Sequence, residues 1–146
     1  MLNLLKDVFS SSQRHKVRYI VIGGIAAVLH GVPRGTIDLA ILIEASPDNA
    51  KKLLDAFLEA RLGTAALTTP EELISQEITI FKDRVRIDVQ TSTPGLKFGE
   101  AWERCETMEY QGQKFYVASR EDLIASKRTA GLPVDLEDVR LLELQE

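Results

Sequence analysis

One short segment constrains the fold more than any other. Residues 17–22 (VRYIVI) are nearly continuous in apolar and β-branched side chains, and Gly23 and Gly24 follow at once. Such a run is typical of a strand that is buried on both faces of a sheet. Residues 25–31 then predict a short helix, and residues 36–44 (TIDLAILIE) predict a second strand. The chain between the strands is long enough for a right-handed crossover containing that helix, so the sequence begins as α/β.

The rest of the chain predicts further helices and two hairpins. Helices are expected over residues 1–16, from a cap at Ser46 to about Gly63, after a cap at Thr69, over 96–104, from a cap at Ser119 to Gly131, and from Pro133 onward. Hairpins are expected from strands at 78–81 and 85–89 and around Gln111 and Gly112. Ser or Thr at a helix start and Gly at its end are ordinary helix boundaries. We therefore expect a mixed α/β (α+β) sheet flanked by helices, with a helical C-terminal tail.

The size of the chain indicates one domain. Its 146 residues fall within the ~100–200 of a typical domain, and no repeat or linker divides them. We expect an N-terminal helix over 1–16, a core over 17–92, and a hairpin with the helical tail over 93–146. A single cysteine, no apolar run of membrane-spanning length and no secretory signal favour the cytoplasm.

The net charge and the missing phosphate-binding motifs limit which nucleic acids and nucleotides the chain is expected to bind. At −4, the chain is unlike the basic domains that bind duplex DNA. The phosphate-binding patterns G-x-x-x-x-G-K-[ST] and G-x-G-x-x-G are both absent. What the sequence offers is Gly23 and Gly24 between a strand and a helix. Glycines there let backbone N–H groups approach a phosphate closely, and the alternative is a tight strand-to-helix turn.

Two aspartates lie in strands that are otherwise apolar. Asp38 enters the second strand, and Asp88 lies inside VRIDV. A buried unpaired carboxylate costs several kcal/mol, so each needs a partner. If the two strands are neighbours, the carboxylates can share a metal cation. The alternative is that each pairs with an arginine, such as Arg34 or Arg86.

The ordered combination of these residues resembles the nucleotidyltransferase (polymerase-β-like) superfamily, and within it the small bacterial proteins grouped with AbiEii-type abortive-infection toxins. The family pattern is a hydrophobic residue, Gly-Gly, a short helix, then Arg-x-Thr-x-Asp-x-Asp on a strand. It is matched in order by Ile22, Gly23, Gly24, Arg34, Thr36 and Asp38, and Asp88 falls at the third carboxylate. The tail is similar to the family's helical tail at Lys127, Ala130, Asp135 and Asp138.

The resemblance implies a reaction. A hydroxyl of RNA or protein attacks the α-phosphorus of a nucleoside triphosphate, and pyrophosphate leaves, with Mg²⁺ ions held by carboxylates. By the same resemblance, Asp38 and Asp88 are catalytic and bind metal, while Gly23, Gly24, Arg34, Thr36 and Lys127 contact the nucleotide. An antitoxin is an implied partner. For Lys127, the residues alone leave a solvated helix face as the alternative.

One position departs from the pattern. Ala40 stands where the family has its second aspartate, and a methyl group cannot bind a metal. We therefore expect weak Mg²⁺ binding and weak or absent transfer. The alternatives are a degenerate nucleotide-binding or regulatory module related to toxin–antitoxin systems, and an interaction protein with salt-bridged aspartates.

Overall fold

The computed structural model describes residues 2–35 and 38–145 of the chain. Its helices are α1 (Leu2–Arg14), α2 (Gly23–Leu29), α3 (Pro47–Glu59), α4 (Pro70–Ser75), α5 (Phe98–Arg104), α6 (Arg120–Ala130) and α7 (Pro133–Glu143), with a 3₁₀ turn η1 (Gly63–Leu67). Its strands are β1 (Tyr19–Ile22), β2 (Leu39–Ile43), β3 (Ile78–Lys82), β4 (Arg86–Gln90), β5 (Glu106–Tyr110) and β6 (Gln113–Val117).

Within the described residues the strands form one mixed sheet, in the order β3-β4-β2-β1-β6-β5. The pairs β2–β4 and β1–β6 are parallel, and the other neighbouring pairs are antiparallel. This confirms the predicted mixed sheet with flanking helices. Both predicted hairpins are present, as β3–β4 and β5–β6.

The predicted crossover between the first two strands is wrong. β1 and β2 are antiparallel neighbours, with Ile22 opposite Ala40. The reason is local: α2 begins at Gly23, directly where β1 ends, and is only seven residues long. At 1.5 Å per residue it spans about 10 Å, and the chain turns back at the same end of the sheet. As a result, the residues just before β2 lie beside the residues just after β1.

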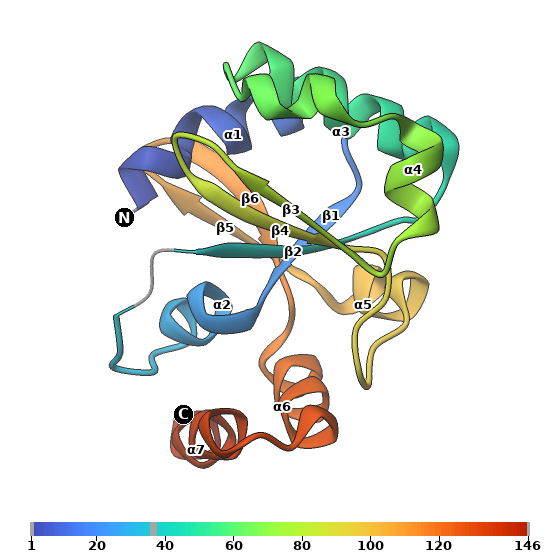
Figure 1. Ribbon diagram of the computed structural model, residues 1–146. Helices are drawn as coiled ribbons and strands as arrows, with labels where there is room; N and C mark the ends of the chain where they lie inside the picture. Colours follow the sequence, from blue (N-terminus) through green and yellow to red (C-terminus); the bar gives the residue numbers. More distant parts are fainter. Residues whose placement is uncertain (1, 36–37, 146) are drawn as a thin grey trace.

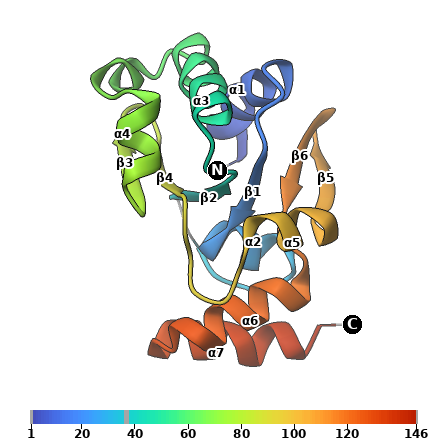
Figure 2. The same cartoon turned by 90° about the vertical axis from the view of Figure 1, so that its right-hand side faces the viewer.

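The helices cover the sheet unequally (Figure 1). Helices α1, α3 and α4 cover one face, while α2, α5, α6 and α7 lie on the other side, with α6 and α7 farthest from the sheet in both views (Figures 1 and 2). Side chains on the α1–α3 face join the main core, including Val21, Ile41, Ile87 and Val89. The opposite face holds a small cluster at Ile20, Ile22, Leu42, Ala101 and Ala118, packed under α5.

The helix boundaries follow the predicted caps. The side chains of Ser46, Thr69 and Ser119 accept hydrogen bonds from backbone N–H groups three residues on. Gly131 ends α6 with φ +71°, the left-handed conformation that glycine adopts without steric cost. Across residues 2–35 and 38–145, no helix combines the length and the apolar character that a membrane span requires.

Candidate functional site

Asp88 lies on β4, and Asp38 lies directly before the neighbouring strand β2, toward the same face of the sheet. β2 and β4 run parallel, with Ala40 opposite Asp88. Asp38 comes two residues before Ala40, and side chains two apart along an extended strand project to the same face. The structure thus brings Asp38 and Asp88 together, as expected from the sequence. It is the face that lies away from α1 and α3.

A guanidinium lies between these carboxylates. Arg86, on β4, donates from Nε to Asp88 Oδ1 at 3.1 Å, and the same nitrogen is 3.8 Å from Asp38 Oδ2. The hydrogen bond with Asp88, and next its charge, raise the pKa of Arg86. The alternative of pairing with an arginine is therefore confirmed for Arg86. Metal binding by the two neighbouring aspartates stays a prediction.

The residues around this position do not fit a two-metal centre. In the described residues, no three or more His, Cys, Asp or Glu side chains converge in a way that could hold a metal ion. The next residue after Asp38 on this face is Ala40, whose methyl group cannot bind a metal. Two carboxylates with one guanidinium carry a net charge near −1, against the +4 of two Mg²⁺ ions.

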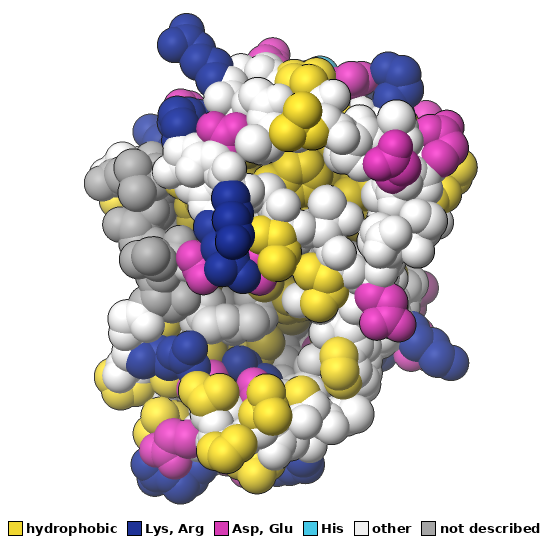
Figure 3. Space-filling view, viewed as in Figure 1, with side chains coloured by type: hydrophobic (Ala, Val, Ile, Leu, Met, Phe, Trp, Pro, Cys, Tyr) yellow, Lys and Arg dark blue, Asp and Glu magenta, His cyan; other side chains and the backbone are white. Residues whose placement is uncertain are grey.

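Part of this face is open to solvent. On the edge strand β3, Ile80 lies opposite Asp88 and Ile78 opposite Gln90. Both isoleucines are about half exposed, at 45% and 50%. Figure 3 shows hydrophobic side chains gathered on this side of the molecule, next to a group of basic and acidic ones. A ligand that contacts Asp88 would therefore also meet apolar surface.

Gly23 occupies a position that only glycine fills without strain. Its φ is +72°, and a Cβ added there would come within 3.3 Å of the Ala40 Cβ. The tight strand-to-helix turn is therefore present. The helix α2 starts with Gly23 and Gly24. The residue before it, Ile22, has no side chain that could accept a hydrogen bond from the first backbone N–H groups of the helix. The tight turn does not exclude phosphate binding, because it leaves these backbone N–H groups without a side-chain partner.

A small pocket of about 120 Å³ joins this turn to the C-terminal helices. Its walls are Ile22, Gly23, Gln90, Thr93, Pro94, Leu123, Ser126, Lys127, Ala130 and Asp135. Lys127 and Gly23, predicted to contact one ligand, thus line one pocket, and Asp38 and Asp88 do not. The spacing from Asp88 indicates Gln90 beforehand, because the two share a face of β4. No sequence pattern pointed to Thr93 or Ser126.

The ammonium of Lys127 is buried and paired. Its Nζ donates to Asp138 Oδ2 at 2.9 Å and lies 4.0 Å from Asp135 Oδ1. The alternative of a solvated helix face is therefore wrong, because α7 folds its acidic residues over this side of α6. The pairing leaves the charge of Lys127 largely neutralised before any ligand binds.

Arg34 shares that partner. Its Nη1 donates to the same Asp138 Oδ2 at 2.7 Å, which ties the segment before β2 to α7. Arg34 therefore contacts the C-terminal tail, and in the described residues its ion-pair partner is Asp138, not Asp38 or Asp88. Thr36, the remaining predicted nucleotide contact, lies outside the described residues.

The family of the chain can be decided at this point. A family model described as a nucleotidyltransferase of unknown function (DUF6036) matches residues 1–146. The chain belongs to this family. A solved structure from Thermotoga maritima, assigned provisionally to the nucleotidyltransferases, has a similar fold: the TM-score is 0.56 at 17% sequence identity, over 97% of this chain and 88% of that one. No curated protein matches the sequence. The general resemblance to nucleotidyltransferases is confirmed, and the closer one to AbiEii-type toxins stays a prediction.

Proposed function

We propose that this member of the DUF6036 family binds a nucleoside triphosphate at the end of β1, β2 and β4. We further propose that it transfers the nucleoside monophosphate to a hydroxyl of RNA or protein at a strongly reduced rate. The observation that carries the proposal is the Arg86 guanidinium between Asp38 and Asp88. It supplies a fixed cation where the family resemblance implies bound Mg²⁺.

The nucleotide-binding half of the proposal is supported by the surroundings of Gly23. Gly23, the first residue of the uncapped helix α2, lines the same pocket as Lys127. Backbone N–H groups without Cβ atoms nearby can approach a triphosphate closely. Gly23, Gly24 and Lys127 are the proposed phosphate contacts, and Arg34 and Thr36 are proposed at the rim.

The transfer half depends on charge. When a hydroxyl oxygen bonds to the α-phosphorus and the bond to pyrophosphate breaks, negative charge builds up on the leaving oxygens, and fixed cations lower that barrier. Arg86 retains N–H groups that can reach a phosphate oxygen. One guanidinium supplies less positive charge than two Mg²⁺ ions, and Ala40 cannot bind a metal that would supply the rest. We therefore expect slow transfer.

A second candidate is a nucleotide-binding or regulatory module without transfer. Two residues favour it. Ala40 stands where the family has a metal ligand, and the guanidinium of Arg86 supplies the positive charge that a metal would supply. The two functions share the binding site and differ only in turnover.

Transfer from a nucleoside triphosphate labelled at the α-phosphate tests the proposal. The chain is incubated with Mg²⁺, total RNA and a protein extract, beside an Asp88→Asn variant. We expect slow labelling that Asp88→Asn abolishes and that Ala40→Asp increases at least about tenfold, since it restores a metal ligand. Nucleotide binding without labelling in either form would leave the module as the function. A chain that binds no nucleotide would contradict both.

The closer relation to AbiEii-type toxins is part of the proposal and rests on the matched tail, Lys127 to Asp138. With it we propose a bacterial origin, an antitoxin partner, a cytoplasmic location and a single domain over residues 1–146. Expression in bacterial cells tests it: a toxin slows growth, and the Asp88→Asn variant does not.

A further inference from the structure

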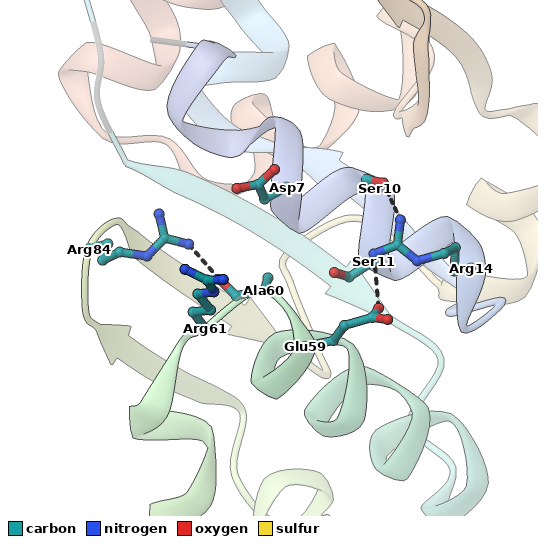
Figure 4. A pocket seen from close by; sticks show the side chains of 8 residues that line it. All are labelled: Asp7, Ser10, Ser11, Arg14, Glu59, Ala60, Arg61 and Arg84. Atoms are coloured by element: carbon teal, nitrogen blue, oxygen red, sulfur yellow. Dashed lines mark hydrogen bonds and ion pairs between the residues drawn. The ribbon is translucent and has the colours of Figure 1, made fainter.

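Another pocket lies on the other side of the sheet from Asp38 and Asp88. It has a volume of about 520 Å³ and is formed by α1, the end of α3 and the β3–β4 turn (Figure 4). Its lining is Asp7, Ser10, Ser11, Arg14, Glu59, Ala60, Arg61 and Arg84. The sequence assigned no function to any of these residues.

Part of the charge in this pocket is already paired. Arg14 donates to Glu59 Oε2 at 3.0 Å, and the ring of His15 is 3.2 Å from the same oxygen. The hydrogen bond with Arg14 is the largest cause that lowers the pKa of Glu59. Arg14 and Glu59 therefore neutralise each other, and the unpaired charge lies elsewhere in the lining.

Two guanidinium groups remain. Neither Arg61 nor Arg84 forms an ion pair with a carboxylate in the described part of the chain. Arg84 donates from Nη2 to the carbonyl of Ala60, the residue before Arg61, so both side chains lie at the same end of the pocket (Figure 4). The nearby carboxylate of Asp83 accepts from Thr64 and from the backbone N–H of Arg84. Among the described lining residues, Asp7 is the one other charged group without an ion pair, so the lining itself carries a net charge of +1, while Asp83, next to Arg84, adds a negative charge at its edge.

The backbone of Arg61 adds an independent observation. It follows the C-terminus of α3 with φ +65°, in the left-handed region, while Leu62 N–H bonds to Phe57 O and Arg61 N–H to Leu58 O. This is the helix-ending motif that favours glycine at the position of Arg61. A side chain held there at a steric cost motivates a search for its function.

We propose that this pocket is a binding site for a phosphate group, held by the guanidinium groups of Arg61 and Arg84. Two guanidinium groups without carboxylates are a matched pair of forks for phosphate oxygens. The site goes beyond the proposed function, because binding there does not require transfer. Arg84 is only two residues before Arg86, so the β3–β4 turn connects the two sites, and a strand of RNA is one source of the phosphate. Free phosphate or pyrophosphate is the other.

Binding titrations with the full chain test the proposal. The probes are inorganic pyrophosphate and a fluorescent single-stranded RNA of about ten nucleotides. Arg61→Gly removes one fork and relieves the backbone, so we expect its thermal midpoint to be unchanged or higher while affinity falls about tenfold or more. Arg61→Lys keeps the charge without the fork and should give an intermediate loss.

Lys16→Gly is the matched control. Lys16 is also basic, also has a positive φ (57°) and also ends a helix, but it does not line the pocket. Its affinity for both probes should equal that of the unchanged chain. Loss with pyrophosphate alone assigns the site to a free phosphate, and loss with RNA assigns it to the strand; either supports the site. Equal affinities for Arg61→Gly and Lys16→Gly, or no binding of either probe at 1 mM, would overturn it.

Discussion

Arg86 Nε lies 3.1 Å from Asp88 Oδ1, two residues along the same strand and on the same face of the sheet. The contact is a charge-assisted hydrogen bond, and it ties the side chain of Asp88 to its own strand. It also brings a permanent positive charge to within 3.8 Å of Asp38. The guanidinium thereby offsets part of the negative charge of the two carboxylates and leaves a net charge near −1 on the three groups.

Replacing Lys127 by alanine should destabilise the fold. The change leaves the buried carboxylate of Asp138 with Arg34 as its remaining partner. Breaking a buried pair typically costs 3–5 kcal/mol, and with Arg34 still present we expect about 3 kcal/mol. Urea denaturation measures it. Arg128→Ala, one residue later and in an exposed pair with Glu143, is the control and should shift the midpoint little.

Replacing Gly23 by alanine should also destabilise the chain, by about 1–2 kcal/mol. The cost comes from φ +72° and from the 3.3 Å approach to the Ala40 methyl group. Gly99 is a matched control, because it lies in α5 and a Cβ added there would meet no atom within 4 Å. Thermal unfolding of both variants checks this. Equal midpoints for Gly23→Ala and Gly99→Ala would show that the turn is not constrained as described.

The two hairpins and the helix caps could be predicted because they depend on neighbours in the sequence. Ser46, Thr69 and Ser119 bond to N–H groups three residues away, so the pattern contains the whole interaction. The direction of β2 could not be predicted in this way. It depends on how α2 meets the end of β1, which the length of the connection does not decide.

Part of the candidate site could also be predicted from the sequence, and part could not. Alternation along strands predicts that Asp38 and Asp88 share a face, and β2–β4 pairing bears this out. Which cation balances them depends on the rotamer of Arg86, and the sequence left metal and arginine as equals. The partner of Lys127 lies 11 residues away on another helix. Helix periodicity alone cannot say how α6 packs on α7.

Asp83 should make stability depend on pH. Hydrogen bonds from the Thr64 backbone N–H and then from that of Arg84 hold the pKa of Asp83 below its ordinary value of 3.8. A carboxyl whose pKa is lower in the folded state contributes stability above its unfolded pKa and loses it as pH falls through the folded pKa. Asp83→Asn should therefore lower the thermal midpoint at pH 7. The difference from the unchanged chain should shrink steadily below about pH 4; a constant difference down to pH 2 would contradict the assignment.

The central claim is that Arg86 occupies the position of a metal between Asp38 and Asp88. The most direct measurement is a calorimetric titration of Mg²⁺ into the nucleotide-free chain and into an Arg86→Gln variant. We expect a dissociation constant above about 1 mM for the unchanged chain, because a guanidinium repels the ion and Ala40 supplies no ligand. Arg86→Gln should bind at least about tenfold more tightly. Micromolar binding by the unchanged chain, with no gain from Arg86→Gln, would contradict the account.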